Sequence, residues 1–209
     1  MIKLTKRPAP PQPITDENHY RSNPNFKALV DDCYGKCYIC ENDKATTLNV
    51  EHLVPHRGND SLKYDWQNLF LSCGHCNNIK GDKYDNILDP TKLDPEEYIS
   101  LSLTTNSFVE NIIVCALSDD ISTKQTVELL SHVYNGGTTD IKDIECTILR
   151  KEVTACVARF LKFVEGYRNE PNEDYDAIIN KEISRDSAFA AFKRGIVRND
   201  TDLFSKFTL

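Results

Sequence analysis

The sequence lacks the features of membrane, secreted and repetitive proteins. No apolar run approaches the ~18 residues that a membrane span needs. Residues 1–8 are charged and then proline-rich, with no apolar h-region, so they are not expected to be a secretory signal. No internal repeat or low-complexity tract occurs beyond this proline-rich stretch. We therefore expect a cytoplasmic globular protein with no membrane association.

Positive charge is also scarce, since the 209 residues carry a net charge of −7. Residues 1–83 hold 11 Lys and Arg against 10 Asp and Glu, whereas residues 84–209 hold 14 against 22. Binding phosphates needs local positive charge. The acidic second half is therefore a poor candidate for contacting nucleic acid, and we expect it to build a core or to meet a protein partner.

Four of the eight cysteines form two Cys-x-x-Cys pairs that are separated by 32 residues. Two such loops can supply four thiolates to one tetrahedral Zn²⁺, and paired cysteines in a reducing compartment are expected to hold metal. A disulfide or unrelated core cysteines are the alternatives. We predict a structural zinc site, worth on the order of 10 kcal/mol of folding free energy, formed by Cys37, Cys40, Cys73 and Cys76.

A carboxylate, an imidazole and two amides lie between these pairs or directly after them, at Glu51, His52, Asn68 and Asn77. Such side chains suit a second, oxygen-rich metal site and phosphodiester hydrolysis, in which a base activates water and a hard cation offsets charge. Neighbours on a strand point to opposite faces. The spacing alone therefore leaves the roles of Glu51 and His52 open.

The first half of the chain predicts short elements around the cysteines. Residues 1–22 are basic and proline-rich, which predicts an extended arm. Residues 23–92 form the next predicted unit. Within it we expect a helix over 23–33, strands over 46–52 and 66–71, and a helix that begins at Asn77.

From about Leu93 onward the pattern becomes helical. Helices are predicted after Ser122 and after Asp140, and over residues 174–185 and 187–198. The apolar stripe of the helix after Asp140 is expected to comprise Ile141, Ile144, Ile148, Val153, Cys156, Val157, Phe160, Leu161 and Val164. We therefore predict an α+β protein whose residues 93–209 form a mainly α-helical, partner-docking region.

Five motif elements in order resemble the HNH (ββα-metal) nuclease family: Glu51-His52-x-x-Pro55, Asn68-Leu69 and Cys73-x-x-Cys76-Asn77-x-x-Lys80-Gly81. The resemblance covers about residues 36–83. It implies that His52 is the general base, that Glu51 and Asn77 hold Mg²⁺ or Mn²⁺, and that Asn68 braces the loop that aims the base. Glu51 and Asn77 stand where Asp and His are commoner, and both suit a hard ion.

A narrower likeness involves residues 64–73, 80–83 and 94–96. These stretches are similar to the HNH subunit of Septu-type and retron-linked anti-phage defence systems, in which the nuclease works beside an ATPase. The resemblance implies a DNA endonuclease that acts with an ATPase subunit. The alternatives are a non-catalytic zinc module that binds nucleic acid or protein, and a stand-alone restriction-type enzyme. A homodimer is also compatible with the sequence.

Three side chains near the motif are candidates for contacting DNA, namely His56, Arg57 and Lys80. Each also has a plainer interpretation as a solvated surface or loop residue. The same holds for Lys3, Lys6 and Arg7, whose alternative is a floppy tail, whereas Trp66 is expected in the core.

Overall fold

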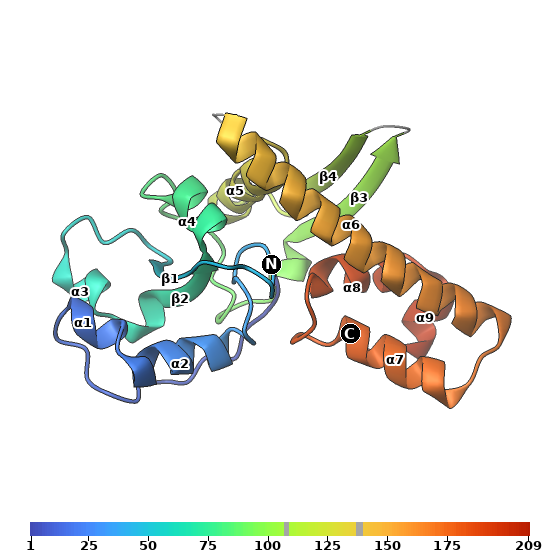
Figure 1. The fold of residues 1–209 in the computed structure, drawn as a ribbon, viewed down its shortest axis with the longest axis horizontal. Coiled ribbons are helices and arrows are strands. Elements are labelled where there is room, and N and C mark those ends of the chain that lie inside the picture. Colours follow the sequence, from blue (N-terminus) through green and yellow to red (C-terminus); the bar gives the residue numbers. More distant parts are fainter. Residues whose placement is uncertain (107–108, 137–139) are drawn as a thin grey trace.

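Short helices and a two-stranded sheet form one side of the molecule. The other side is mainly helical, contains the longest helices and carries a second two-stranded sheet (Figure 1). The computed structural model describes residues 1–106, 109–136 and 140–209. The first side holds α1 (Glu17–Tyr20), α2 (Asn23–Asp32), β1 (Leu48–His52), α3 (Asp60–Lys63), the 3₁₀ turn Trp66–Asn68, β2 (Leu69–Cys73) and α4 (Gly74–Lys80). The second holds a 3₁₀ turn (Pro95–Glu97), β3 (Ile99–Asn106), β4 (Val109–Ala116), α5 (Ile121–Asn135), α6 (Asp140–Asn169), α7 (Glu173–Ile183), α8 (Ala190–Arg198) and α9 (Thr201–Lys206).

The first side is built on the antiparallel pair β1–β2 and the helix that follows it. Leu48 lies opposite Cys73, and His52 lies opposite Leu69. Helix α4 follows β2 directly and packs against both strands. The predicted strand–loop–strand–helix order is confirmed. The start of the second predicted strand is a 3₁₀ turn, because the Asp65 side chain accepts from the Gln67 amide and caps it.

The second side contains a hairpin, β3–β4, that the sequence analysis did not predict. Ile99, Leu101 and Ile112 are buried, and polar residues alternate with the apolar residues along β3. Helix α8 packs against β3, and α5 packs against β4. The period of two in residues 99–104 is the signal of a half-buried strand. The part after Leu93 is therefore mainly, but not wholly, helical.

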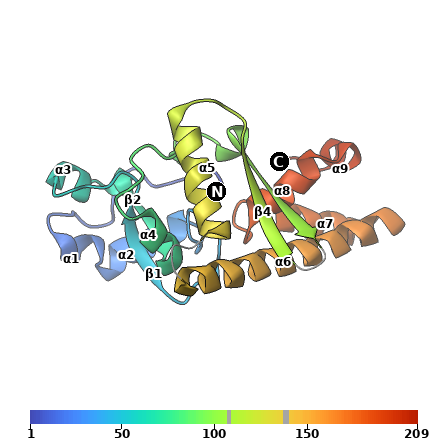
Figure 2. The same ribbon diagram turned by 90° about the horizontal axis from the view of Figure 1, so that it is seen from above.

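Helix α6 runs from the middle of the molecule, where it packs against α5, to the end that carries α7 (Figure 2). Its buried face consists of Cys146, Leu149, Val153, Cys156, Val157, Phe160 and Val164. The predicted stripe was wrong for Ile144, Ile148 and Leu161, which are 60%, 54% and 45% exposed. Ile141 lies among residues whose side chains are not described. The nine predicted positions spread around more of the helix circumference than the face that is buried, so three of them point toward solvent.

The N-terminal stretch packs against the first side instead of forming a free arm. Met1, Ile2 and Leu4 are buried in the main core. The Lys6 ammonium group donates to the Trp66 and Leu69 carbonyls and lies over the Trp66 ring. Burial lowers the pKa of Lys6 to about 8. The stretch has no helix or strand before α1, as predicted, but these anchors hold it against the protein and engage the Lys6 ammonium group, so Lys6 is not placed to contact DNA.

One apolar core runs across both sides of the molecule. It joins the four Cys-x-x-Cys cysteines and Phe70 to residues of α5, α6 and α8, including Tyr134, Leu149 and Phe192. A second cluster lies at the far end, where α6, α7 and α9 meet. The predicted boundary near Leu93 thus marks a change of architecture without a break in packing. None of the described helices is long and apolar enough to cross a bilayer.

Candidate active site and zinc centre

The four cysteine side chains converge on one point in the core. Their sulfur atoms all lie within 4.8 Å of one another, and Cys40 Sγ lies 3.9 Å from Cys73 Sγ. Tetrahedral zinc with Zn–S distances of about 2.3 Å requires sulfur separations of roughly 3.8 Å. All four cysteines are buried and free of disulfides, and burial raises the pKa of the Cys76 thiol. This donor set fits a structural Zn²⁺, whose charge would offset the loss of the thiol protons.

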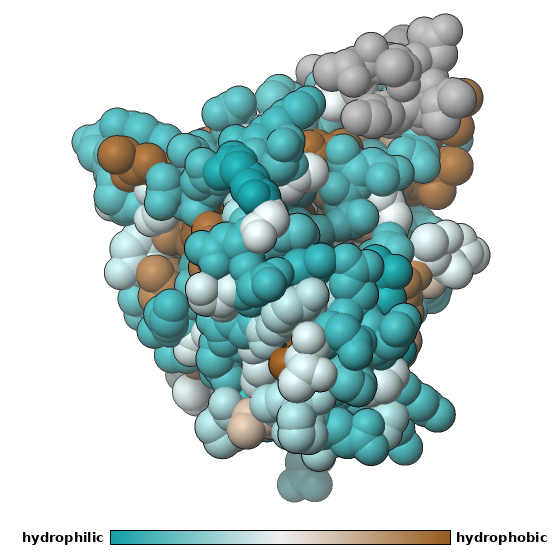
Figure 3. Space-filling view, turned by 90° about the vertical axis from the view of Figure 1, so that its left-hand side faces the viewer, coloured by the Kyte–Doolittle hydropathy of each residue, from teal (hydrophilic) through white to brown (hydrophobic). Residues whose placement is uncertain are grey.

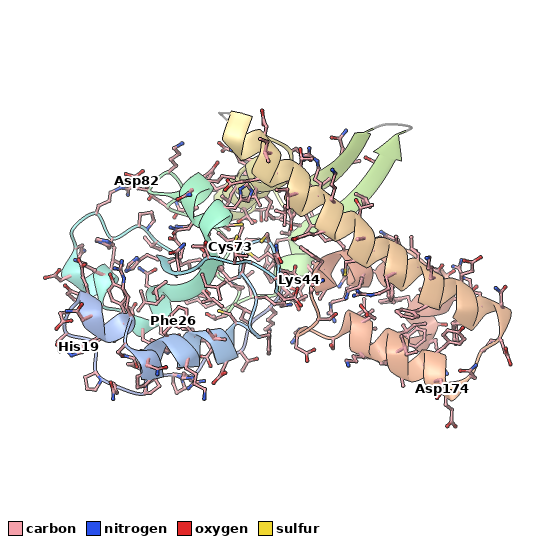
Figure 4. The ribbon with its side chains drawn as sticks, in the orientation of Figure 1. His19, Phe26, Lys44, Cys73, Asp82 and Asp174 are labelled. Carbon is pink, nitrogen blue, oxygen red and sulfur yellow. The ribbon has the colours of Figure 1, made fainter. Side chains whose placement is uncertain are left out.

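The loops that carry the cysteines are anchored by the helical side. The Tyr134 hydroxyl donates to the Cys40 carbonyl at 3.1 Å, and the Asn42 amide donates to Glu152 at 2.5 Å. His75, which lies between two cysteines, donates from Nε2 to the Val133 carbonyl at 2.8 Å. Figure 4 shows sulfur atoms gathered beside the label of Cys73, near the middle of the molecule. The four cysteines, which are the candidate zinc ligands, therefore lie at the junction of the two sides.

His52 stands at the end of β1 with one ring nitrogen already engaged. Its Nε2 lies 3.0 Å from the Lys63 carbonyl, which can only accept a hydrogen bond. Nε2 therefore carries the proton, and Nδ1 of the neutral ring keeps its lone pair. Burial lowers the pKa of His52, which favours this neutral form at neutral pH. The Tyr20 and His56 rings pack against the imidazole, at 5.9 and 4.7 Å between centroids.

Asn68 ties together the loop between β1 and β2. Its Nδ2 donates to the Val54 and Leu62 carbonyls, both at 2.9 Å, and its Oδ1 accepts from the Val54 amide at 2.8 Å. Leu62 directly precedes Lys63, whose carbonyl accepts a hydrogen bond from His52 Nε2. Asn68 is only 5% exposed, so water does not compete for these bonds. This side chain thus makes the contacts expected of a brace for the loop that aims His52.

Glu51 faces the opposite side of β1 from His52, as strand alternation requires. Its Oε1 accepts from the Lys80 ammonium group at 2.7 Å. Burial raises the pKa of the Glu51 carboxyl, and Lys80 opposes that shift. Asn77 lies three residues before Lys80 on α4, so both side chains project from one face of the helix. Glu51 and Asn77 therefore offer a carboxylate and an amide, ligands that suit a hydrated hard cation.

The three side chains predicted to contact DNA lie in different surroundings. His56 packs beside His52 and accepts from the Gly58 amide at 3.1 Å. Arg57 is exposed but pairs with Asp85 at 2.8 Å. Lys80 is fully buried, so the predicted phosphate contact is not open to it in this structure. The end of the molecule that carries α1 and α3 is largely hydrophilic (Figure 3).

Two contributors to this site had no usable signal in the sequence. Lys63 acts through its backbone carbonyl, which any residue at that position offers. Tyr20 belongs to the segment that was expected to be an extended arm, yet it lies in α1, is 3% exposed and packs against His52. A third contact, between Lys80 and Glu51, joins residues 29 positions apart and depends on how α4 crosses β1.

The comparisons with known proteins agree with the motif. Residues 37–83 match the model of the HNH endonuclease family. Septu protein PtuB of Bacillus thuringiensis is 29% identical to this chain over 149 residues, which are 62% of this chain and 54% of that protein. The chain thus spans about half the length of this curated relative. No solved structure matches. Residues 37–83 therefore form an HNH endonuclease-family domain, as the resemblance of the motif indicated.

Proposed function

We propose that this protein is a Mg²⁺- or Mn²⁺-dependent endonuclease that hydrolyses DNA phosphodiester bonds. The observation that carries the proposal is the hydrogen bond from His52 Nε2 to the Lys63 carbonyl, at 3.0 Å. It leaves Nδ1 unprotonated, as a general base requires. The Asn68 brace supports this arrangement from the other end of the same loop.

In the proposed reaction His52 Nδ1 takes the proton of a water molecule that attacks the phosphorus. The Lys63 carbonyl keeps the ring in one tautomer and one orientation during this transfer. Glu51 and Asn77 would hold the divalent ion at the end of β1, because Glu51 and His52 leave the strand on opposite faces and His52 is its last residue. When bound, that ion supplies positive charge to the scissile phosphate and to the leaving oxygen. The four cysteines would hold a separate Zn²⁺ with a structural role.

The neutral state of His52 matters because only an unprotonated ring can accept a proton. Burial holds the pKa of His52 below its usual value, so the base form persists to lower pH than for a free histidine. Asn77 supports an oxygen-preferring ion at this site, because an amide oxygen is a poor ligand for zinc but a usual one for hard cations.

We further propose that the enzyme is the effector nuclease of a Septu-type anti-phage system and works with an ATPase subunit in the cytoplasm. Two facts support this: the likeness to Septu protein PtuB, and the acidic, mainly helical residues 93–209. An acidic surface is a poor phosphate binder and suits a protein partner. Regulation of the nuclease by such a partner would also protect the host DNA from unregulated cleavage.

The test is cleavage of supercoiled plasmid DNA by the purified protein, with and without its ATPase neighbour. We expect nicking that requires Mg²⁺ or Mn²⁺ and that is lost in Glu51→Gln and Asn77→Ala. Asn78→Ala is the matched control, because Asn78 is the next residue of α4 and is exposed. Folded, zinc-loaded wild-type protein that binds DNA but cuts none, with either ion and with the partner present, would leave the non-catalytic zinc module instead.

A further inference from the structure

Lys80 is the buried cation closest to the proposed chemistry, and it lies in the last turn of α4. Its side chain is completely shielded from solvent. A lysine is almost never fully buried unless its charge is paired, because the uncompensated desolvation cost is large. Its position therefore needs a physical reason, and a contact with DNA does not supply one.

The ammonium group has two partners, and both belong to the end of β1. It donates to Glu51 Oε1 at 2.7 Å and to the backbone carbonyl of His52 at 2.7 Å. Charge-assisted hydrogen bonds of this length are strong and directional. Lys80 therefore fixes the carboxylate that is proposed to hold the ion, and it also fixes the backbone of the proposed base.

The same side chain ties α4 to these two residues. Asn77, the second proposed ion ligand, lies one turn earlier on that helix, and its carbonyl accepts from the Gly81 amide just after Lys80. Lys80 thus contacts two of the three residues that the proposed reaction uses, and it belongs to the helix that carries the third.

We propose that Lys80 is a positioning residue that aligns Glu51, His52 and helix α4, and that it does not contact DNA. This inference rests on the proposed nuclease function and assigns a role to a side chain that sequence reasoning placed at the DNA backbone. Outer-shell partners of metal ligands commonly act in this way, because they fix the rotamer of the ligand.

Lys36 offers a matched control, since it is another buried lysine in the same part of the molecule. It is 1% exposed, and it donates to the Arg185 and Ser187 carbonyls, both at 2.7 Å. These contacts link the segment just before Cys37 to the loop before α8 and do not involve Glu51 or His52. Lys36→Met therefore breaks buried lysine contacts of similar length away from the proposed site.

The first measurement is the salt dependence of DNA binding without added divalent ion. A lysine that contacts a phosphate of B-DNA contributes about 0.9 to the slope of log K against log salt concentration. We expect the slope of Lys80→Met to equal that of the wild type. A decrease of about one unit would make Lys80 a phosphate ligand and would overturn the proposal.

The second measurement is single-turnover cleavage at saturating DNA with Mg²⁺, below the melting temperature of every variant. We expect Lys80→Met to lower the rate by about 10- to 100-fold, with the DNA concentration for half-saturation unchanged. Lys36→Met should keep the wild-type rate per folded molecule. A wild-type rate in Lys80→Met, or an equal loss in Lys36→Met, would overturn the proposal.

A melting-temperature cycle with Glu51→Gln covers the case in which Lys80→Met folds poorly. Breaking a buried ion pair on one side is costly, whereas removing both charges is often tolerated. We therefore expect Glu51→Gln/Lys80→Met to recover most of the melting temperature that Lys80→Met loses. Additive losses would show that the two side chains are not coupled, and the proposal would fail.

These outcomes separate the two proposals. Wild-type cleavage together with undiminished cleavage by Lys80→Met would remove the role of Lys80 and leave the nuclease intact. A wild-type protein that cuts no DNA would remove the nuclease function and with it any positioning role, whatever the melting-temperature cycle shows.

Discussion

The cysteine-bearing part, residues 1–92, is made of short elements, with five residues in each of β1 and β2 and seven in α4, whereas α6 alone has 30 residues. These short elements share the main apolar core with the helical part, through residues such as Phe70 and Leu71. Four convergent thiols and buried polar side chains such as Asn68 and Lys80 add further contacts that fix their positions. The helical part relies on long apolar faces and on ion pairs between its own residues.

Because of this difference, mutations in the two parts should have different effects. In the cysteine-bearing part, the buried side chains of Asn68 and Lys80 contact the loop that holds His52 and the strand that carries Glu51, so changes at these two side chains should alter chemistry. In the helical part the buried charges pair with one another, as Glu96 does with Arg194, so changes there should alter stability alone. The two parts meet at the cysteine loops, where Tyr134 and Glu152 of the helical part contact Cys40 and Asn42.

Removal of zinc should have the largest effect, and it should affect both parts. Zinc bound by four thiolates contributes about 10 kcal/mol to folding in small domains, which is comparable to the whole stability of a typical protein. We expect Cys73→Ser to lose zinc by elemental analysis and to lose cooperative thermal unfolding by circular dichroism. Native-like melting of a zinc-free protein would show that the core does not depend on the metal.

Glu96→Gln should destabilise the helical part without changing chemistry. Glu96 is 6% exposed and accepts from Arg194 at 2.7 Å. Removing one charge of such a buried pair costs about 3–5 kcal/mol, because the other charge is left uncompensated. We expect a lower urea midpoint and an unchanged cleavage rate per folded molecule. The control is Asp119→Asn, which breaks the exposed pair with Lys124 and should leave the midpoint where it is.

Asn68→Ala should slow cleavage while zinc stays bound. The loop then loses three hydrogen bonds, and the Lys63 carbonyl is held less firmly against His52. We expect a loss of about 10- to 100-fold in single-turnover rate. Asn25→Ala is the matched control, because Asn25 is also buried and makes three backbone hydrogen bonds in the same part. Equal losses of rate in both variants would attribute the effect to general loosening.

Ile148→Ser should have the smallest effect. Ile148 is 54% exposed on α6, so little apolar contact is lost, and the unfolding free energy should stay within about 0.5 kcal/mol. Leu149→Ser, one residue further along the same helix, removes a buried side chain and introduces a polar group. It should lower the melting temperature clearly. Comparable shifts for the two variants would mean that the buried face of α6 is not the one described.

Much of the architecture follows from local patterns. The cysteine spacing predicted the convergent thiols, and the strand–loop–strand–helix order around them is present. The helices after Ser122 and Asp140 are present as α5 and α6. The hairpin β3–β4 was not predicted although residues 99–104 alternate between apolar and polar, because this period of two covers only six residues in a region where helical spacing dominates.

The site was less predictable, because its contacts join distant positions. Nothing local in the sequence says that Lys80 reaches Glu51, that the Lys63 backbone holds His52, or that Tyr20 packs on the imidazole. Each contact depends on how two elements cross. The roles assigned to His52, Glu51 and Asn68 are predictions that their hydrogen bonds support, whereas the role assigned to Asn77 rests on its place on α4.

The most direct test of the account is the single-turnover rate of DNA cleavage by His52→Ala, measured beside its zinc content and melting temperature. Loss of a general base lowers a rate by about 10²- to 10⁴-fold. We expect a fall of that size, with one zinc per chain and a melting temperature close to that of the wild type. A folded, zinc-loaded His52→Ala protein that cuts DNA at the wild-type rate would contradict the account.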